Sequence, residues 1–224
     1  MVTKLIRRVT TSVLAATLLL ALAPGTCHAQ AATADEGLIV ALGDSLTAGL
    51  GLNERDAWPA QLERRLRAAG FHWKVVNAGI SGETSSGALA RLDWVLGLKP
   101  DILVLETGAN DGLRGIPTKV LQANLDMMLT TLDAKRVTVI LAGMQMLRNL
   151  GPSYTAAFAR VYPEMAQKHG AILIPFLLEG VAANPALNQA DGLHPTVEGY
   201  RIVTDLVYPR VLDAIARVRS TRAR

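Results

Sequence analysis

LIVALGDSL, residues 38–46, is an apolar run that stops at a glycine and then presents a serine. A continuous run of apolar and β-branched residues is typical of a strand buried on both faces of a parallel sheet. A serine at the strand-to-helix turn that follows can expose its hydroxyl group, and the first N–H groups of the helix can bind an oxyanion. The stretch therefore predicts a buried strand with a candidate nucleophile, Ser45, directly after it.

Similar apolar runs recur along the chain, and each is followed by a segment with helical spacing. They are Trp73–Val76, Ile102–Leu105, Val137–Leu141 and Ile172–Ile174. This alternation predicts a parallel sheet that is covered by helices on both faces. A last helix is expected to begin at Pro195, because proline suits the first turn of a helix. No linker or repeat divides residues 30–224, so we expect a single domain, a three-layer α/β/α sandwich with a five-stranded parallel sheet.

The amino-terminal segment has the pattern of an export signal. Its first eight residues carry three basic side chains and no acid, an apolar run follows at Val13–Ala23, and small residues surround Ala29. This pattern predicts a secretory signal peptide over residues 1–29, cleaved near Ala29, and hence a periplasmic or secreted protein. The apolar run is about half as long as a membrane-spanning helix, so we expect no stable membrane anchor.

The composition narrows the classes of partner and cofactor. Most of the formal net charge of +4 belongs to the predicted signal peptide, and the remaining residues 30–224 carry a net charge of only +1. We therefore expect no nucleic-acid partner. The only cysteine, Cys27, leaves with the signal, so the mature chain has neither a disulfide nor a thiol nucleophile. The histidines lack the spacing of metal ligands, so we expect no metal and no cofactor. The modest charge and the absence of an evident apolar patch make a monomer the expected state.

Polar residues follow the strands where a ligand would bind. NAGISGET, residues 77–84, follows the second predicted strand, and TGAND, residues 107–111, follows the third. In parallel sheets the carboxyl ends of the strands converge on the ligand. Near the end of the chain, Asp191 and His194 supply the carboxylate and the imidazole that a nucleophilic serine needs. Of the four histidines, only His194 has both an acid within reach and a loop position.

Four motifs in this order resemble those of the SGNH (GDSL-type) hydrolase superfamily, and within it the exported bacterial thioesterase I, lysophospholipase and arylesterase group. They are GDSL at residues 43–46, AGISG at 78–82, GANDGLRG at 108–115 and DGLHP at 191–195. The resemblance covers nearly the whole chain after the predicted signal peptide. It implies the flavodoxin-like fold of that superfamily.

The resemblance also implies roles for individual residues. Ser45 is the expected nucleophile, with Asp191 and His194 as the base pair. The expected oxyanion hole consists of Ser45, Gly79 and Asn110.

Three charged residues near these motifs leave alternatives open. Asp44 is either a second base or, as we favour, an acceptor for nearby backbone N–H groups. Asp111 is expected to hold the loop of the third motif, and Arg114 either meets a substrate anion or braces a loop.

The expected function is that of a serine esterase that hydrolyses carboxylic esters or thioesters through an acyl-Ser45 intermediate. Its expected partners are small molecules: an ester, a thioester or a lysophospholipid. Met144, Met146 and Leu147 follow the fourth predicted strand and either line an acyl channel or pack beneath a loop. The alternative is a noncatalytic ligand-binding module on the same fold, and the presence of all the expected site residues argues against it.

Overall fold

The computed structural model describes residues 35–146 and 148–224, and these belong to one compact unit. The predicted signal peptide, the domain boundary at residue 30 and Leu147 lie outside the described residues. The strands are β1 (Gly37–Gly43), β2 (Trp73–Gly79), β3 (Ile102–Glu106), β4 (Thr138–Ala142) and β5 (Ile172–Ile174). The helices are α1 (Ser45–Ala48), α2 (Trp58–Ala68), α3 (Ser85–Ala90), α4 (Leu92–Gly97), α5 (Ala109–Leu113), α6 (Thr118–Ala134), α7 (Pro152–His169) and α8 (Val197–Arg222), with short 3₁₀ turns at Glu54–Asp56 and Arg148–Leu150.

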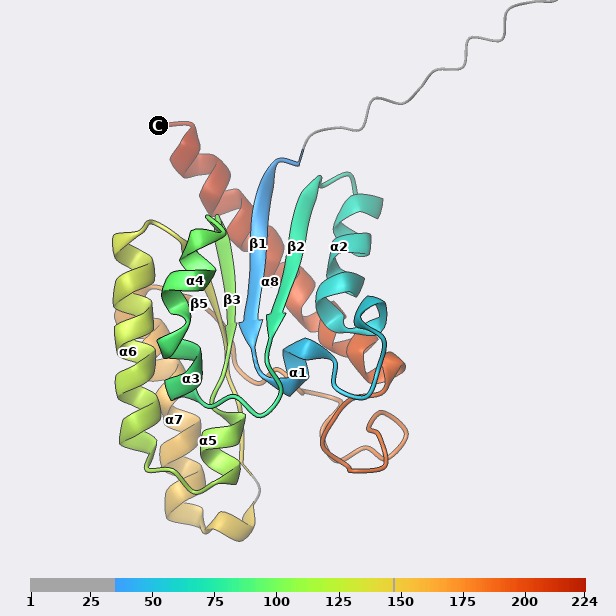
Figure 1. Cartoon of the computed structure of the whole chain (residues 1–224), viewed down its shortest axis with the longest axis vertical. Helices are drawn as coiled ribbons and strands as arrows, with labels where there is room; N and C mark the ends of the chain where they lie inside the picture. Colours follow the sequence, from blue (N-terminus) through green and yellow to red (C-terminus); the bar gives the residue numbers. More distant parts are fainter. Residues whose placement is uncertain (1–34, 147) are drawn as a thin grey trace, which may run out of the picture. The chain divides into compact units, whose positions relative to one another are not determined.

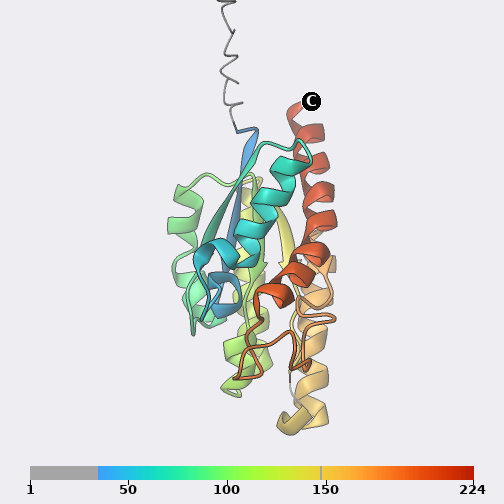
Figure 2. The ribbon, with the colours of Figure 1, turned by 90° about the vertical axis from the view of Figure 1, so that its right-hand side faces the viewer.

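The five strands form one parallel sheet with the order β2-β1-β3-β4-β5. Helices α2 and α8 pack against each other, and α3, α6 and α7 form a second contacting row. In Figure 1, α8 passes behind the sheet whereas α3 and α4 lie in front of it, and Figure 2 shows the sheet between these layers. The predicted three-layer fold and its five strands are therefore confirmed.

The central strand explains why the sheet forms where the sequence predicts it. Every residue of β3 is buried, as expected for a strand that is covered on both faces. Its last residue, Glu106, places a carboxyl group at zero exposure.

The register of the strands brings the predicted motifs to one edge of the sheet. Gly43 at the end of β1 is paired with Gly79 of β2, and Leu42 is paired with Leu105 of β3. The segments that follow these strands therefore meet around α1, toward which β1 and β2 point in Figure 1.

One predicted boundary is wrong. The last helix begins at Val197 and not at Pro195, because Thr196 caps it: the Thr196 hydroxyl accepts a hydrogen bond from Gly199 N at 3.2 Å. Pro195 instead pairs with Asn188 in an isolated antiparallel bridge. Among the described residues, no helix combines the length and the apolar character needed to cross a membrane.

Leu103, in the middle of β3, offers a test of the core. Leu103 is fully buried, so Leu103→Ala removes apolar contacts and leaves a cavity, and we expect the free energy of unfolding to fall by about 2–5 kcal/mol. Urea denaturation measures this change. Met127→Ala on α6 is the control, since Met127 is 50% exposed, and it should change the value by less than about 0.5 kcal/mol.

Candidate active site

The turn after β1 presents Ser45 as the first residue of α1. Asp44 caps this short helix, and its Oδ1 atom accepts a hydrogen bond from Leu46 N at 2.9 Å. The structural role that the sequence favours for Asp44 is therefore confirmed at this atom. The cap fixes the backbone on both sides of the serine.

Gly43 is required by close packing beneath this turn. A Cβ atom at this position would overlap the Thr47 hydroxyl and Glu106 Oε2. Glu106 Oε2 accepts hydrogen bonds from Asp44 N at 3.0 Å and from Thr47 Oγ1 at 2.9 Å. The turn is therefore held against the end of β3.

Ser45, His194 and Asp191 form a chain of hydrogen bonds. His194 Nε2 lies 2.9 Å from Ser45 Oγ, and His194 Nδ1 lies 2.7 Å from Asp191 Oδ2. Because a carboxylate can only accept, Nδ1 carries the proton, and Nε2 is left free to accept from the serine hydroxyl. Serine and histidine are 149 residues apart in sequence, and the fold brings them into contact.

Asp191 is held by its own loop. Its Oδ1 atom accepts from the backbone N–H groups of Leu193 at 2.9 Å and His194 at 3.0 Å. The N–H of His194, the N–H of Leu193 and the His194 ring together lower the pKa of Asp191 to about 2. The carboxylate is therefore ionised when it orients the imidazole.

Asn110, in α5, lies on the other side of the serine. Its Nδ2 atom donates to Asp44 Oδ2 at 3.1 Å, which leaves the second hydrogen of the amide uncommitted by this bond. Asp111 holds the same segment, because its two carboxylate oxygens accept from Ser85 N at 2.7 Å and from Ser85 Oγ at 2.5 Å.

Gly82, and not Gly79, lines the cavity at Ser45. The Gly79 N–H is committed to Asn77 Oδ1 at 3.0 Å, and a Cβ atom on Gly79 would overlap Ala48 N, so Gly79 packs beneath α1. Gly82 has a φ of +81°, lines the same cavity as Ser45, and has no hydrogen-bond partner for its N–H among the described residues.

Arg114 braces the Gly82 turn, because its Nη2 atom donates to Gly82 O at 2.7 Å. Of the two roles that the sequence left open for Arg114, binding a substrate anion or bracing a loop, this contact agrees with bracing a loop. Both glycines belong to the motif AGISG, in which the resemblance assigned the role of oxyanion donor to Gly79 and not to Gly82.

Arg91 is a site neighbour that sequence reasoning missed. Its Nη2 atom donates to Ala78 O at 2.7 Å and to Gly43 O at 3.2 Å, so it joins the ends of β1 and β2. Nε and Nη2 also bind the Glu83 carboxylate at 2.7 and 2.6 Å. This largely buried ion pair ties the strand ends to the loop that carries Gly82. In the sequence, the Arg91–Glu83 pair is visible only as two opposite charges in neighbouring segments. Many exposed residue pairs have the same pattern, so it does not mark the pair as part of the site.

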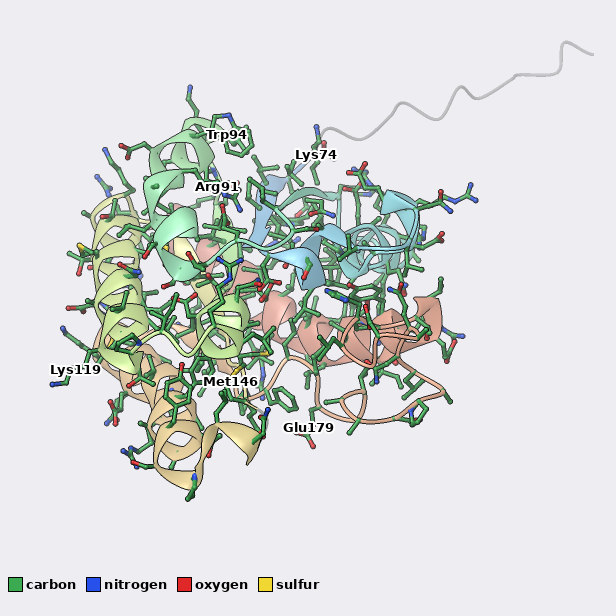
Figure 3. All side chains as sticks on the ribbon, turned by 60° about the horizontal axis from the view of Figure 1, so that its bottom comes forward. Lys74, Arg91, Trp94, Lys119, Met146 and Glu179 are labelled. Carbon is green, nitrogen blue, oxygen red and sulfur yellow. The ribbon has the colours of Figure 1, made fainter. Side chains whose placement is uncertain are left out.

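A cavity of about 370 Å³ opens at the serine. Met144 and Met146 line it, together with other apolar side chains that include Leu113 and Phe176. Met146 lies at the carboxyl edge of the sheet, which Figure 3 turns toward the viewer, and its thioether packs over Gly112. Within the part of the chain that the structure describes, no three side chains of His, Cys, Asp or Glu gather as metal ligands.

Comparison with known proteins identifies the family. The profile of the GDSL-like Lipase/Acylhydrolase family matches residues 41–202. The chain is 44% identical over 181 residues to esterase TesA of Pseudomonas aeruginosa, which covers 80% of this chain and 89% of the relative. It is 37% identical over 182 residues to an arylesterase of Vibrio mimicus, covering 81% of this chain and 90% of that protein. Thioesterase 1/protease 1/lysophospholipase L1 of Escherichia coli K12 is 37% identical over 177 residues, which cover 79% of this chain and 83% of that protein.

Solved structures agree with the sequence relatives. The crystal structure of TesA superposes with a TM-score of 0.76 at 42% identity, covering 79% of this chain and 99% of that one. The psychrotrophic esterase EstA from a Pseudoalteromonas species has a TM-score of 0.77 at 33% identity, covering 81% and 100%. This chain therefore belongs to the GDSL-like lipase/acylhydrolase family. It is an SGNH-type esterase, and the alternative of a noncatalytic binding module is not favoured.

The low pKa of Asp191 can be measured directly. We expect the carboxyl carbon of Asp191 to titrate by NMR with a midpoint of about 2, because two backbone N–H groups and the His194 ring favour its charged form. The stabilisation from this lowered pKa is present above the unfolded value of about 3.9 and is lost as the pH falls through about 2. A midpoint near that of a free aspartate would contradict the prediction.

Proposed function

We propose that this esterase works through a covalent acyl-Ser45 intermediate, with His194 as general base and acid and Asp191 as its orienting carboxylate. The observation that carries this proposal is the hydrogen-bond chain from Ser45 Oγ to His194 at 2.9 Å and from His194 to Asp191 at 2.7 Å. A serine hydroxyl is a weak nucleophile until a positioned base takes its proton.

The reaction proceeds in two halves. Ser45 Oγ attacks the carbonyl carbon while His194 Nε2 takes the hydroxyl proton, and the carbonyl electron pair moves to the oxygen. When the tetrahedral intermediate collapses, the bond to the leaving group breaks and His194 returns the proton to that group. Water then attacks the acyl-serine with the same proton path, releasing the carboxylic acid and restoring Ser45.

The developing oxyanion needs donors, and three groups supply them in our proposal. These are Ser45 N–H at the start of α1, Gly82 N–H and the uncommitted hydrogen of Asn110 Nδ2. Gly82 replaces Gly79, whose N–H already donates to Asn77. One such donor is worth about 3 kcal/mol in other serine hydrolases.

For the substrate, we propose an ester or thioester with an apolar acyl chain, of the kind found in aryl esters and lysophospholipids. The support is the apolar wall of the cavity at Ser45, with Met144 and Met146 in it. The names of the relatives, an arylesterase and a thioesterase/lysophospholipase, fit the same range of substrates.

We further propose that residues 30–224 act as a single domain outside the cytoplasm after a signal peptide at residues 1–29 is removed. The support is the basic and then apolar pattern of that segment. An exported enzyme meets little cytosolic acyl-CoA, so aryl esters or lysophospholipids suit this location better than acyl-CoA. A monomer suffices for this proposal, because all the proposed site residues come from one chain.

Ser45→Ala, His194→Ala and the double variant test the proposed mechanism. Each single change should lower kcat for p-nitrophenyl butyrate by about 10⁴-fold or more, and the double variant should lose little more than either, because the residues act as one unit. Steady-state kinetics on folded protein measures these losses. Multiplicative losses in the double variant would show that the two side chains work separately.

Met146→Ala tests the proposed acyl cavity. It enlarges the space at the serine, so the optimum in a p-nitrophenyl ester series from acetate to palmitate should move to longer chains. Each further buried methylene is worth about 0.8 kcal/mol, or about fourfold in kcat/KM. Met127→Ala is the control, because the Met127 side chain of α6 is 50% exposed. If the order of preference is the same in both variants, Met146 only packs against the loop.

A further inference from the structure

Glu106 is a buried acid that the proposed mechanism does not use. Its side chain has no exposure, and one of its oxygens, Oε2, accepts from Asp44 N and Thr47 Oγ1. These two donors flank Ser45 in sequence. A single oxygen atom therefore holds the turn on both sides of the nucleophile.

The other oxygen, Oε1, receives no hydrogen bond from the described residues and has no contact with solvent. The carboxylates of Asp111 and Asp191 differ, because each accepts hydrogen bonds on both oxygens. A charged carboxylate with one bare oxygen in the core is costly, whereas a neutral carboxylic acid can use that oxygen to carry a proton.

The Asp44 carboxyl group is the candidate acceptor for this proton. Glu106 Oε2 accepts from Asp44 N at 3.0 Å, so the two buried residues are in direct contact, and the carboxyl group of each shifts the pKa of the other. Asp44 also accepts from Leu46 N and from Asn110 Nδ2, so it is the member of the pair that is surrounded by donors. The contacts thus run from Glu106 through Asp44 to Asn110.

The electrostatic surroundings favour the same arrangement. Burial raises the pKa of Glu106 well above its usual value, and the charge of Asp44 raises it further. The other titratable groups that face the pair are Tyr162 of α7, Tyr200 of α8 and His194, which favours the charged form of Asp44. Burial and the neighbouring Asp44 charge therefore both favour the protonated form of Glu106.

We propose that Glu106 is a positioning residue that acts as a neutral carboxylic acid, donating its proton to Asp44 and thereby orienting the Asn110 amide beside Ser45. This inference rests on the proposed function in assigning Asn110 to the oxyanion hole. The protonation of Glu106 itself can be tested without any assay of activity.

A glutamine at this position separates the neutral acid from an anion. Its amide oxygen can accept from Asp44 N and Thr47 Oγ1, and its NH₂ group can donate to Asp44 in place of the acid proton. Glu106→Gln therefore keeps every contact of the neutral acid. If Glu106 were an anion with no donor role, the same substitution would bury an NH₂ group that has no acceptor.

The first experiment measures unfolding free energy by urea denaturation at several pH values from about 6 to about 9, for the wild type and for Glu106→Gln. In the unfolded chain glutamate ionises with a pKa of about 4.3, so a proton retained in the fold makes wild-type stability fall as the pH rises. We expect the folding constant of the wild type to fall relative to Glu106→Gln by up to about tenfold per pH unit.

Asp101→Asn is the matched control for this experiment. Asp101 also accepts from a backbone N–H of β1, that of Leu38 at 2.9 Å, but at the opposite end of the strand, and it pairs with Arg222. Its effect should be the same at every pH in this range. If the curve of Glu106→Gln likewise runs parallel to that of the wild type, Glu106 is an anion and the proposal is overturned.

The second experiment compares kcat and KM of Glu106→Gln, Glu106→Leu and Asn110→Ala at equal folded fraction. We expect glutamine to keep kcat within about threefold and leucine to lower it about 10- to 100-fold, with KM nearly unchanged, because a misplaced donor affects the transition state. If glutamine lowers kcat as much as leucine, Glu106 does not act through a donated proton. If the leucine variant does not fold, the pH dependence of the unfolding free energy of Glu106→Gln still tests whether Glu106 is protonated.

The two proposals fail in different ways. If Asn110→Ala left kcat unchanged, Asn110 would not belong to the oxyanion hole. The protonation of Glu106 would then still be tested by the pH dependence of the unfolding free energy. In an Asn110→Ala background, Glu106→Leu should cost much less in kcat than it does in the wild type, since the two changes remove one effect. A full additional loss would show that Glu106 acts by another route.

Discussion

The parallel register of β1 against β2 and β3 is the constraint on which the whole site depends. Because Gly43 is level with Gly79, and Leu42 with Leu105, three loops leave the sheet at one height. Ser45, Gly82 and Asn110 come from these three loops. A shift of one residue in the pairing of β1 with β3 would turn Glu106 away from the turn before Ser45, since side chains alternate along a strand. The register of the buried strands therefore sets which polar groups can meet at the site.

Buried polar side chains then refine what the register brings together. Arg91 joins the carbonyl groups at the ends of β1 and β2 to Glu83, and Glu106 joins the Ser45 turn to β3. Both contacts lie on the inner side of the loops, out of solvent, where a missing partner is expensive. Arg91, Glu83 and Glu106 do not line the cavity at Ser45, which the same segments border with Gly82 and Asn110. These three supporting side chains therefore lie apart from the cavity wall.

The sequence predicts the parts of this molecule that depend on local patterns. The apolar runs locate all five strands, and the motifs locate Ser45, Asp191 and His194, which the fold brings into contact. Gly79 was the glycine expected in the oxyanion hole, but its N–H group donates to the side chain of Asn77, which lies outside the motif, and Gly82 lines the cavity instead. The pairing of Arg91 with Glu83 and the placement of Glu106 beneath Asp44 depend on tertiary packing, which no spacing along the chain records.

The position of His194 late in the chain has a consequence for biosynthesis. The fifth strand ends at Ile174, so the whole sheet and the serine turn have been made before Asp191 and His194. His194 is then held in place by the turn before α8, a helix that packs on α2 and on the sheet. A growing chain therefore carries Ser45 for most of its synthesis without the imidazole that hydrogen-bonds to it. The chain of hydrogen bonds from Ser45 through His194 to Asp191 is completed only after the segment before α8 has been made.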